Sequence, residues 1–163
     1  GAVDAGTVVA ANFNSPKQTV ISGEAAAVEK ACGLCKEAGA KRAIVLKVSG
    51  AFHSPLMKSA AEKLAPEVEK AEITAPKFPV IANFTGEAVS DPADIRKALV
   101  AQVTGSVQWV KTLATMRALG AGEFLELGPG RVLAGLTKRT LSGASISSLG
   151  TLEAIKDYAP PAG

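Results

Sequence analysis

The sequence predicts an α/β fold, from two observations on element order and one on composition. The first four elements are expected in the order strand, strand, helix, strand, and from residue 80 onward short apolar strands alternate with amphipathic helices. Apolar residues make up 47% of the 163 residues and charged residues 20%, which is the balance of a globular protein. Aromatic residues account for only 4%, so aliphatic side chains and alanine must fill most of the core.

The amino-terminal unit starts with two runs of strand-forming residues, 8–11 and 18–21, joined by a turn-forming Asn-Ser-Pro-Lys segment. An alanine-rich helix is expected over residues 24–38, ended by Gly39. The β-branched run at residues 43–48 predicts another strand. This order resembles the later part of a split βαβ, ferredoxin-like unit, whose opening strand and helix would come before this sequence begins.

A loop at residues 49–55 leads into a region where strands and helices are expected to alternate as in a parallel α/β sheet. Pro66 is expected to kink its helix or end it early. The Ser-Asp-Pro run at residues 90–92 is typical of a helix start, and Ser106 is expected to cap the next helix. The predicted elements are strands at 80–83, 124–127 and 145–149 and helices at 56–70, 92–104, 107–116, 131–140 and 151–158.

Charge and hydropathy argue against two classes of function. The net charge is +3, and lysine and arginine are scattered among aspartate and glutamate, whereas a nucleic-acid-binding surface shows clustered basic residues. No apolar stretch reaches the roughly 20 residues that a membrane-spanning helix needs. We therefore expect neither a nucleic-acid partner nor a membrane partner.

Cys32 and Cys35 form a C-x-x-C late in the first predicted helix. A redox pair of this kind normally opens a helix, where the dipole favours the thiolate. No second cysteine pair is present to complete a zinc site. We interpret both as inert thiols, predict no metal site, and expect the reducing cytoplasm as the compartment.

The one histidine of the chain, His53, is the best candidate for acid–base chemistry. Histidine is the residue type that most readily takes up and releases a proton near neutral pH. His53 lies in the predicted loop beside serine and proline, where functional residues concentrate. A general base for a serine or cysteine nucleophile would suit this position. The alternative is a structural histidine, which is the commoner role for a lone imidazole.

The matching nucleophile is not found in the sequence. A hydrolase-like site needs a serine on a sharp strand-to-helix turn of the form G-x-S-x-G, and no serine among the 163 residues lies in that motif. The sequence carries half of such a site, and we expect the isolated chain to be inactive.

Four motifs, in order, resemble those of malonyl-CoA:acyl carrier protein transacylases and related acyltransferase domains. They are NFNSPxQxVISG from residue 12, GAFHSPLM from residue 50, ALVxQVxxxVQW from residue 98 and ELGPGxVLxGLxKR from residue 126. Together they span residues 12–139 and so cover nearly the whole chain.

The resemblance implies an acyltransferase of fatty acid biosynthesis with two subdomains. Residues 1–49 would be the remainder of a ferredoxin-like small subdomain, and residues 50–163 the carboxy-terminal part of a large α/β-hydrolase-like subdomain. In a ping-pong reaction, a serine takes a malonyl group from malonyl-CoA, and the phosphopantetheine thiol of acyl carrier protein accepts it. Malonyl-CoA is then a substrate, acyl carrier protein is a partner, and no bound cofactor is expected.

The resemblance also assigns site residues. His53 matches the general base, and Gln102 matches the residue whose backbone carbonyl orients the imidazole in place of the usual carboxylate. Phe52 is expected to border the acyl group, and Asn12 and Asn14 match polar positions beside the CoA or phosphopantetheine channel. The catalytic serine, its oxyanion donor and an arginine for the malonyl carboxylate have no match here, so we expect the missing amino-terminal half to supply them.

Two alternatives remain open from the sequence. The chain could be the acyltransferase piece of a larger polyketide or fatty acid synthase, or it could be a non-catalytic module that binds a carrier protein.

Overall fold

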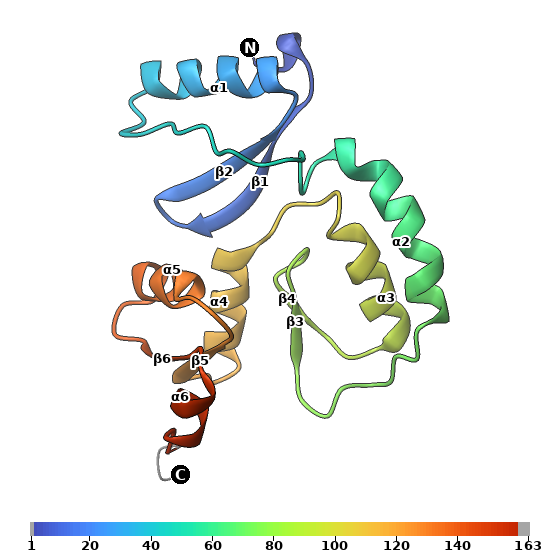
Figure 1. Ribbon diagram of the computed structural model, residues 1–163, viewed down its shortest axis with the longest axis vertical. Helices are drawn as coiled ribbons and strands as arrows, with labels where there is room; N and C mark the ends of the chain where they lie inside the picture. The colour runs from blue at the N-terminus through green and yellow to red at the C-terminus, as the bar shows by residue number, and fades with distance from the viewer. Residues whose placement is uncertain (1, 160–163) are drawn as a thin grey trace.

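A computed structural model describes residues 2–159 as a mixed α/β structure (Figure 1). Within these residues the strands form three two-stranded sheets, of which β1–β2 and β3–β4 are antiparallel and β5–β6 is parallel. The elements in chain order are η1 Ala2–Ala5, β1 Val8–Ser15, β2 Gln18–Gly23, α1 Ala25–Glu37, η2 Pro55–Met57, α2 Lys58–Lys70, β3 Val80–Ala82, β4 Glu87–Val89, α3 Pro92–Ala101, α4 Trp109–Ala118, β5 Glu123–Leu127, α5 Val132–Thr140, β6 Ser145–Leu149 and α6 Leu152–Lys156.

The β1–β2 hairpin and α1 form the first unit, as the sequence predicted. The two strands pair in antiparallel register and are longer than the predicted runs. α1 buries Ala27 and Ala31, whose small side chains let the helix approach its neighbours closely. Gly39 follows the helix with a φ of 92°, the left-handed conformation that favours glycine after a helix end.

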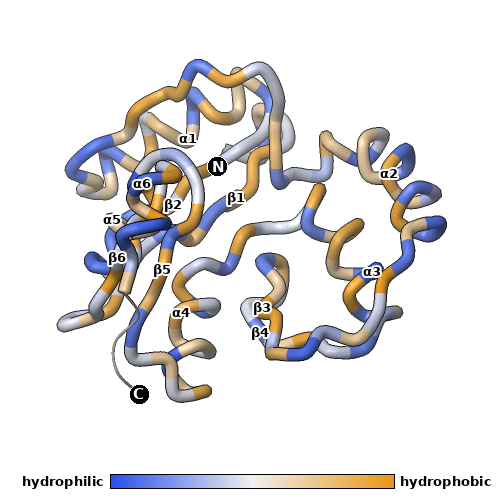
Figure 2. Tube along the Cα trace, turned by 60° about the horizontal axis from the view of Figure 1, so that its bottom comes forward, coloured by the Kyte–Doolittle hydropathy of each residue, from blue (hydrophilic) through white to orange (hydrophobic). Residues whose placement is uncertain are grey.

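The strand predicted at residues 43–48 is wrong for this structure. The segment has no regular structure and crosses from α1 toward α2 (Figure 1). It is mostly hydrophobic (Figure 2), yet Ile44 is 69% exposed and Val45 is 65% exposed. A strand needs a neighbour to pair its backbone N–H and C=O groups, and no strand in the described residues pairs with this segment.

The single parallel sheet expected from residue 80 onward is also wrong, because β3 pairs with β4 and not with β5. A tight turn before β4 reverses the chain, and Gly86 in this turn has a φ of 66°. The β4 strand has only three residues, too few to give a periodic signal in the sequence.

Of the two outcomes predicted for Pro66, a kink or an early helix end, the early end does not occur. α2 continues through this residue to its end at Lys70 and buries Ala61 and Val68 on one face. Packing of this amphipathic face outweighs the one backbone hydrogen bond that a proline removes.

The prediction that Ser106 caps α4 is wrong. Its hydroxyl donates to the carbonyl of Ala10 in β1, with an oxygen–oxygen distance of 2.6 Å. Gln108 is the N-cap residue instead. Because the backbone of Val107 pairs with β1, the helix begins only after that pairing ends.

The core of the structure is built from small and aliphatic side chains. Leu113 of α4 and Ala27 of α1 are fully buried, whereas Leu127 and Val132 are 71% and 70% exposed. None of the described helices is both long and apolar enough to cross a membrane.

β5, α5 and β6 form the predicted parallel unit, and Glu126 links the three elements. Its Oε1 accepts from the backbone N–H of Leu133 at 2.9 Å, and its Oε2 accepts from that of Ala134 at 3.0 Å. The carboxylate thus satisfies N–H groups in the first turn of α5 that have no partner within the helix. The Ser148 hydroxyl of β6 donates to Oε2 at 3.2 Å.

We predict that Glu126→Gln destabilises the fold in a pH-dependent way. Burial raises the pKa of the Glu126 carboxyl, but the hydrogen bonds from Ala134, Leu133 and Ser148 outweigh it and leave this pKa below its ordinary value. A depressed pKa stabilises the folded state above the ordinary glutamate pKa of about 4.3, and this stabilisation is lost as the pH falls through the folded-state pKa.

The wild type should therefore be more stable than the variant near neutral pH, and the difference should shrink as the pH falls below about 4.3. Urea denaturation at a series of pH values measures this difference. A difference that does not change with pH would contradict the prediction.

Candidate active site

His53 lies in the loop that precedes η2 and α2, and its half-buried ring contacts the end of α3. Its Nδ1 is 2.8 Å from the carbonyl oxygen of Gln102. Because a carbonyl only accepts hydrogen bonds, Nδ1 carries the hydrogen and donates it. In the neutral imidazole, Nε2 on the far side of the ring then keeps its lone pair, which is the form that a general base requires.

α3 provides this acceptor because of where the helix ends. Gln102 is the C-cap residue of α3, and the last carbonyls of a helix have no partner within the helix. The same end carries the negative end of the helix dipole, which favours an N–H donor. The contact uses only the backbone of Gln102.

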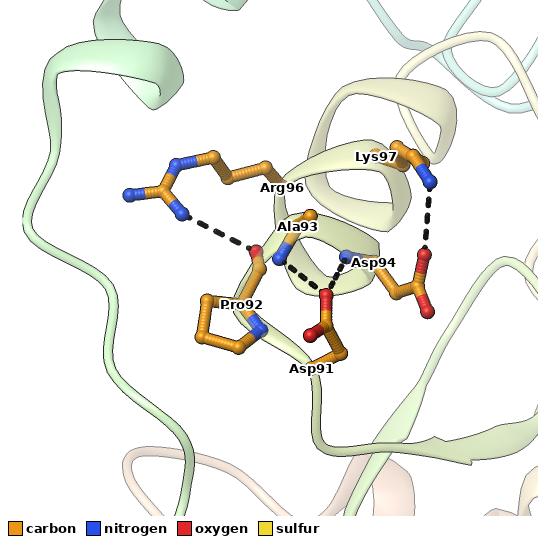
Figure 3. Close-up of polar contacts among 6 residues, drawn as sticks. All are labelled: Asp91, Pro92, Ala93, Asp94, Arg96 and Lys97. Carbon is orange, nitrogen blue, oxygen red and sulfur yellow. Dashed lines mark hydrogen bonds and ion pairs between the residues drawn. The ribbon is translucent and has the colours of Figure 1, made fainter.

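Side-chain hydrogen bonds also hold the start of α3 and link the helix to the end of α2. The Asp91 carboxylate accepts from the N–H groups of Ala93 and Asp94 at 2.8 Å and 3.2 Å (Figure 3). Arg96 of α3 donates to the carbonyl of Ala71, just beyond α2, at 2.8 Å. This hydrogen bond links the end of α2, the helix that follows His53, to α3, the helix that ends at Gln102.

The backbone of His53 is strained. Among the described residues, it is the one non-glycine residue with a positive φ, at 57°. This left-handed conformation costs roughly 1–2 kcal/mol for a residue with a Cβ atom. Residues held in such conformations cluster at functional sites, where the surrounding contacts maintain them.

The connection between α3 and α4 joins the Gln102 end of the site to β1. The N–H of Val107 donates to the carbonyl of Ala11 at 2.8 Å, and the carbonyl of Val107 accepts from the N–H of Phe13 at 2.9 Å. A shift of β1 would therefore act on the segment that carries the acceptor carbonyl.

The other predicted site residues are less directly connected. Asn12 and Asn14 are half-buried in β1, and within the described part of the chain no hydrogen bond joins either side chain to His53. The Phe52 side chain is 52% exposed, and its ring packs beside Gly50. Of the five predicted residues, His53 and Gln102 are the pair that a side-chain hydrogen bond joins across the fold.

The sequence interpretation missed Ser54. This residue is fully buried, and its hydroxyl donates to the carbonyl of Ala51 and accepts from the N–H of Leu56. Serine followed by Pro55 is a common signal for a helix start, so the cap on η2 could have been found.

The two cysteines of α1 are free thiols, with Cys32 half-buried and Cys35 exposed. Across residues 2–159, no group of three or more histidine, cysteine, aspartate and glutamate side chains is placed to hold a metal ion.

A family model described as the acyl transferase domain matches residues 2–158. The chain belongs to this family. The malonyl CoA-acyl carrier protein transacylase of Haemophilus influenzae is 45% identical over 93% of the chain, and the match covers 49% of that protein. The chain thus spans about half the length of the curated relatives it matches.

Solved structures of malonyltransferases also match this acyl transferase domain, and again over about half of their own length. The acyl-carrier-protein S-malonyltransferase of Burkholderia pseudomallei superposes with a TM-score of 0.91 and 44% identity, over 96% of this chain and 51% of that one. A malonyl-transacylase in complex with a type II polyketide acyl carrier protein superposes with a TM-score of 0.89 and 44% identity, over 95% of this chain and 50% of that one.

We predict that Gly105→Ala destabilises the connection after Gln102. A Cβ atom here would overlap the ring of Phe84 and lie 3.0 Å from the carbonyl oxygen of Ala101. Overpacking of this kind typically costs about 1–3 kcal/mol. Chemical denaturation measures the loss.

Gly33→Ala in α1 is the matched control. An added Cβ meets nothing within 4 Å at this position, and replacing a helical glycine by alanine stabilises a helix by roughly 0.5–1 kcal/mol. Equal stability of the two variants would contradict the prediction.

Proposed function

We propose that this acyl transferase domain provides the general base of a malonyl-CoA:acyl carrier protein transacylase, an acyltransferase of fatty acid biosynthesis. The observation that carries the proposal is the hydrogen bond from Nδ1–H of His53 to the carbonyl of Gln102, which leaves Nε2 able to accept a proton. The names of its relatives support the choice of malonyl-CoA as donor and acyl carrier protein as acceptor.

In this proposal the nucleophile lies outside these 163 residues. No serine of the chain stands in a G-x-S-x-G motif, and the H. influenzae relative extends well beyond the region matched here. The rest of a longer protein would supply the serine, its oxyanion donors and an arginine to pair with the malonyl carboxylate.

The proposed reaction has two halves. As the serine oxygen attacks the thioester carbonyl of malonyl-CoA, Nε2 of His53 takes the serine proton, and it returns that proton to the CoA sulfur as CoA leaves. The phosphopantetheine thiol of acyl carrier protein then gives its proton to Nε2 and attacks the malonyl ester. The serine oxygen recovers a proton from Nε2 when the malonyl group departs.

A backbone carbonyl suits this substrate better than a carboxylate would. It fixes the imidazole tautomer without placing another full negative charge near the malonyl carboxylate. The C-terminal end of α3 adds only a partial negative charge.

We assign Asn12 and Asn14 to the wall of the channel for CoA or phosphopantetheine. Both are half-buried in β1, and β1 pairs with the connection that follows Gln102. Amide side chains there could hydrogen-bond a passing pantetheine arm. No bound cofactor takes part in this scheme.

We also assign the chain to two subdomains. Residues 1–49 would complete a ferredoxin-like sheet once a strand of the longer protein pairs with the exposed apolar segment at residues 43–48. Residues 50–163 would form the carboxy-terminal part of an α/β-hydrolase-like subdomain. The exposure of Leu125 and Leu127, at 45% and 71%, supports this assignment because both faces of a parallel sheet are normally covered.

We predict that His53→Ala, in the complete enzyme, lowers the rate of malonyl transfer about a hundredfold or more, the usual scale for losing a general base. The complete enzyme is this chain together with the segment that carries the serine, and the chain alone should transfer nothing. Steady-state transfer from malonyl-CoA to acyl carrier protein measures the effect.

Gln102→Ala is the matched control, because the backbone carbonyl that contacts His53 survives the substitution. It should reduce the rate far less. A His53→Ala enzyme with unchanged turnover and an unchanged pH profile would make His53 structural and would favour the non-catalytic module.

We predict that Phe52→Ser relaxes selectivity for the acyl group. The exposed ring beside His53 would border the α-carbon of the malonyl group, and an extra methyl packed against it would cost about 1–3 kcal/mol. The variant should raise kcat/KM for methylmalonyl-CoA relative to malonyl-CoA by roughly tenfold or more.

Phe78→Ser is the control for this change, because Phe78 is 73% exposed in the segment before β3. It should leave the ratio of the two specificity constants unchanged. If the ratio also stays constant in a folded Phe52→Ser enzyme, Phe52 does not contact the acyl group.

A further inference from the structure

Ser54 closes the loop around His53. Its side chain is 0% exposed. The hydroxyl donates to the carbonyl oxygen of Ala51 at 2.7 Å and accepts from the N–H of Leu56 at 3.3 Å. One partner precedes His53 in the chain and the other follows it, so the hydroxyl bridges the segment that contains the imidazole.

The orientation of the imidazole depends on the conformation of that segment. The direction of the Cα–Cβ bond of His53 is set by its backbone, and at a φ of 57° the ring reaches the carbonyl of Gln102. Relaxation of His53 to an ordinary right-handed or extended conformation would turn the Cβ atom away. Nδ1 would then lose its acceptor.

We propose that Ser54 is a positioning residue for His53, because its hydroxyl holds the left-handed turn that aims the imidazole at Gln102. The catalytic consequence rests on the function proposed above, whereas the effect on the imidazole does not.

Capping of η2 requires only one of the two hydrogen bonds that the Ser54 hydroxyl makes. Ser54 is the N-cap residue of η2, and its carbonyl accepts from the N–H of Met57. Capping uses only the acceptor side of the hydroxyl, toward Leu56. The bond donated to Ala51 lies upstream of His53, contributes nothing to the helix, and is the shorter of the two.

Removing the hydroxyl would leave two backbone groups without their partner. Backbone groups that lose a partner rearrange to find another or to reach water. In this loop, such a rearrangement would let the backbone of His53 leave its left-handed conformation. We therefore expect an effect on the imidazole beyond a loss of stability.

The test uses Ser54→Ala in the complete enzyme labelled with ¹⁵N-histidine. The ring signals of His53 are identified by their loss in His53→Gln. In the wild type the Nδ1–H proton should be protected from exchange with water by its bond to Gln102. In Ser54→Ala it should exchange roughly tenfold faster or more, as expected when a hydrogen bond is lost.

Malonyl transfer by the same variant should fall roughly ten- to a hundredfold, the scale for a misplaced catalytic group. The loss should appear in kcat and not in KM, because Ser54 is fully buried and is not placed to contact the substrate.

Two further variants complete the experiment. Ser59→Ala removes an exposed hydroxyl from α2 and should leave both readouts unchanged. Ser54→Cys keeps a weak donor of similar shape and should give intermediate exchange and activity. It also replaces the alanine variant if that protein does not fold.

A Ser54 variant that loses thermal stability but keeps the wild-type exchange rate of Nδ1–H would overturn the proposal, since Ser54 would then only stabilise the fold. If the complete wild-type enzyme transfers no malonyl group, the proposed function fails, but the exchange measurement still decides the role of Ser54.

Discussion

The hydrogen bond from Nδ1 of His53 to the carbonyl oxygen of Gln102 is the contact on which the proposed chemistry of this domain depends. It joins two residues that are 49 positions apart and fixes which ring nitrogen is free. Because the acceptor is a backbone atom, the contact depends on where α3 ends and not on the side chain at that position. The N-cap at Asp91 and the hydrogen bond from Arg96 to Ala71 therefore help to position the acceptor carbonyl, because both hold α3 in place.

Rough free energies explain why the hydrogen bond to Gln102 does not by itself hold His53 in its left-handed conformation. The left-handed backbone of His53 costs roughly 1–2 kcal/mol, whereas a typical hydrogen bond contributes only about 0.5–1.5 kcal/mol net. The bond to Gln102 alone would barely offset the strain. The two bonds of the buried Ser54 hydroxyl supply the remainder, so the imidazole is held from the backbone side and from the ring side together.

Local patterns predicted the elements that pair or pack with near neighbours in the chain, such as β1, β2, α1 and the β5–α5–β6 unit. Residues 43–48 have the composition of a strand, but composition does not supply the partner that a strand requires. His53 could be selected from its residue type and its loop. Its tautomer could not, because the tautomer depends on the distant end of α3. Its φ could not either, because that conformation depends on which backbone groups the buried Ser54 hydroxyl contacts. The role of Gln102 was predicted only from the family resemblance, because every residue type has a backbone carbonyl and the sequence cannot show which one accepts the hydrogen bond.

The central claim is that His53 acts as the base for a nucleophile that another part of the protein supplies. Its most direct test is to incubate the complete enzyme with labelled malonyl-CoA, quench in acid and map the modified peptide by mass spectrometry. The malonyl ester should lie on a serine outside these 163 residues, and its rate of formation should fall sharply in His53→Ala. A malonyl ester on a serine within this chain, or one formed at the same rate without His53, would contradict the claim.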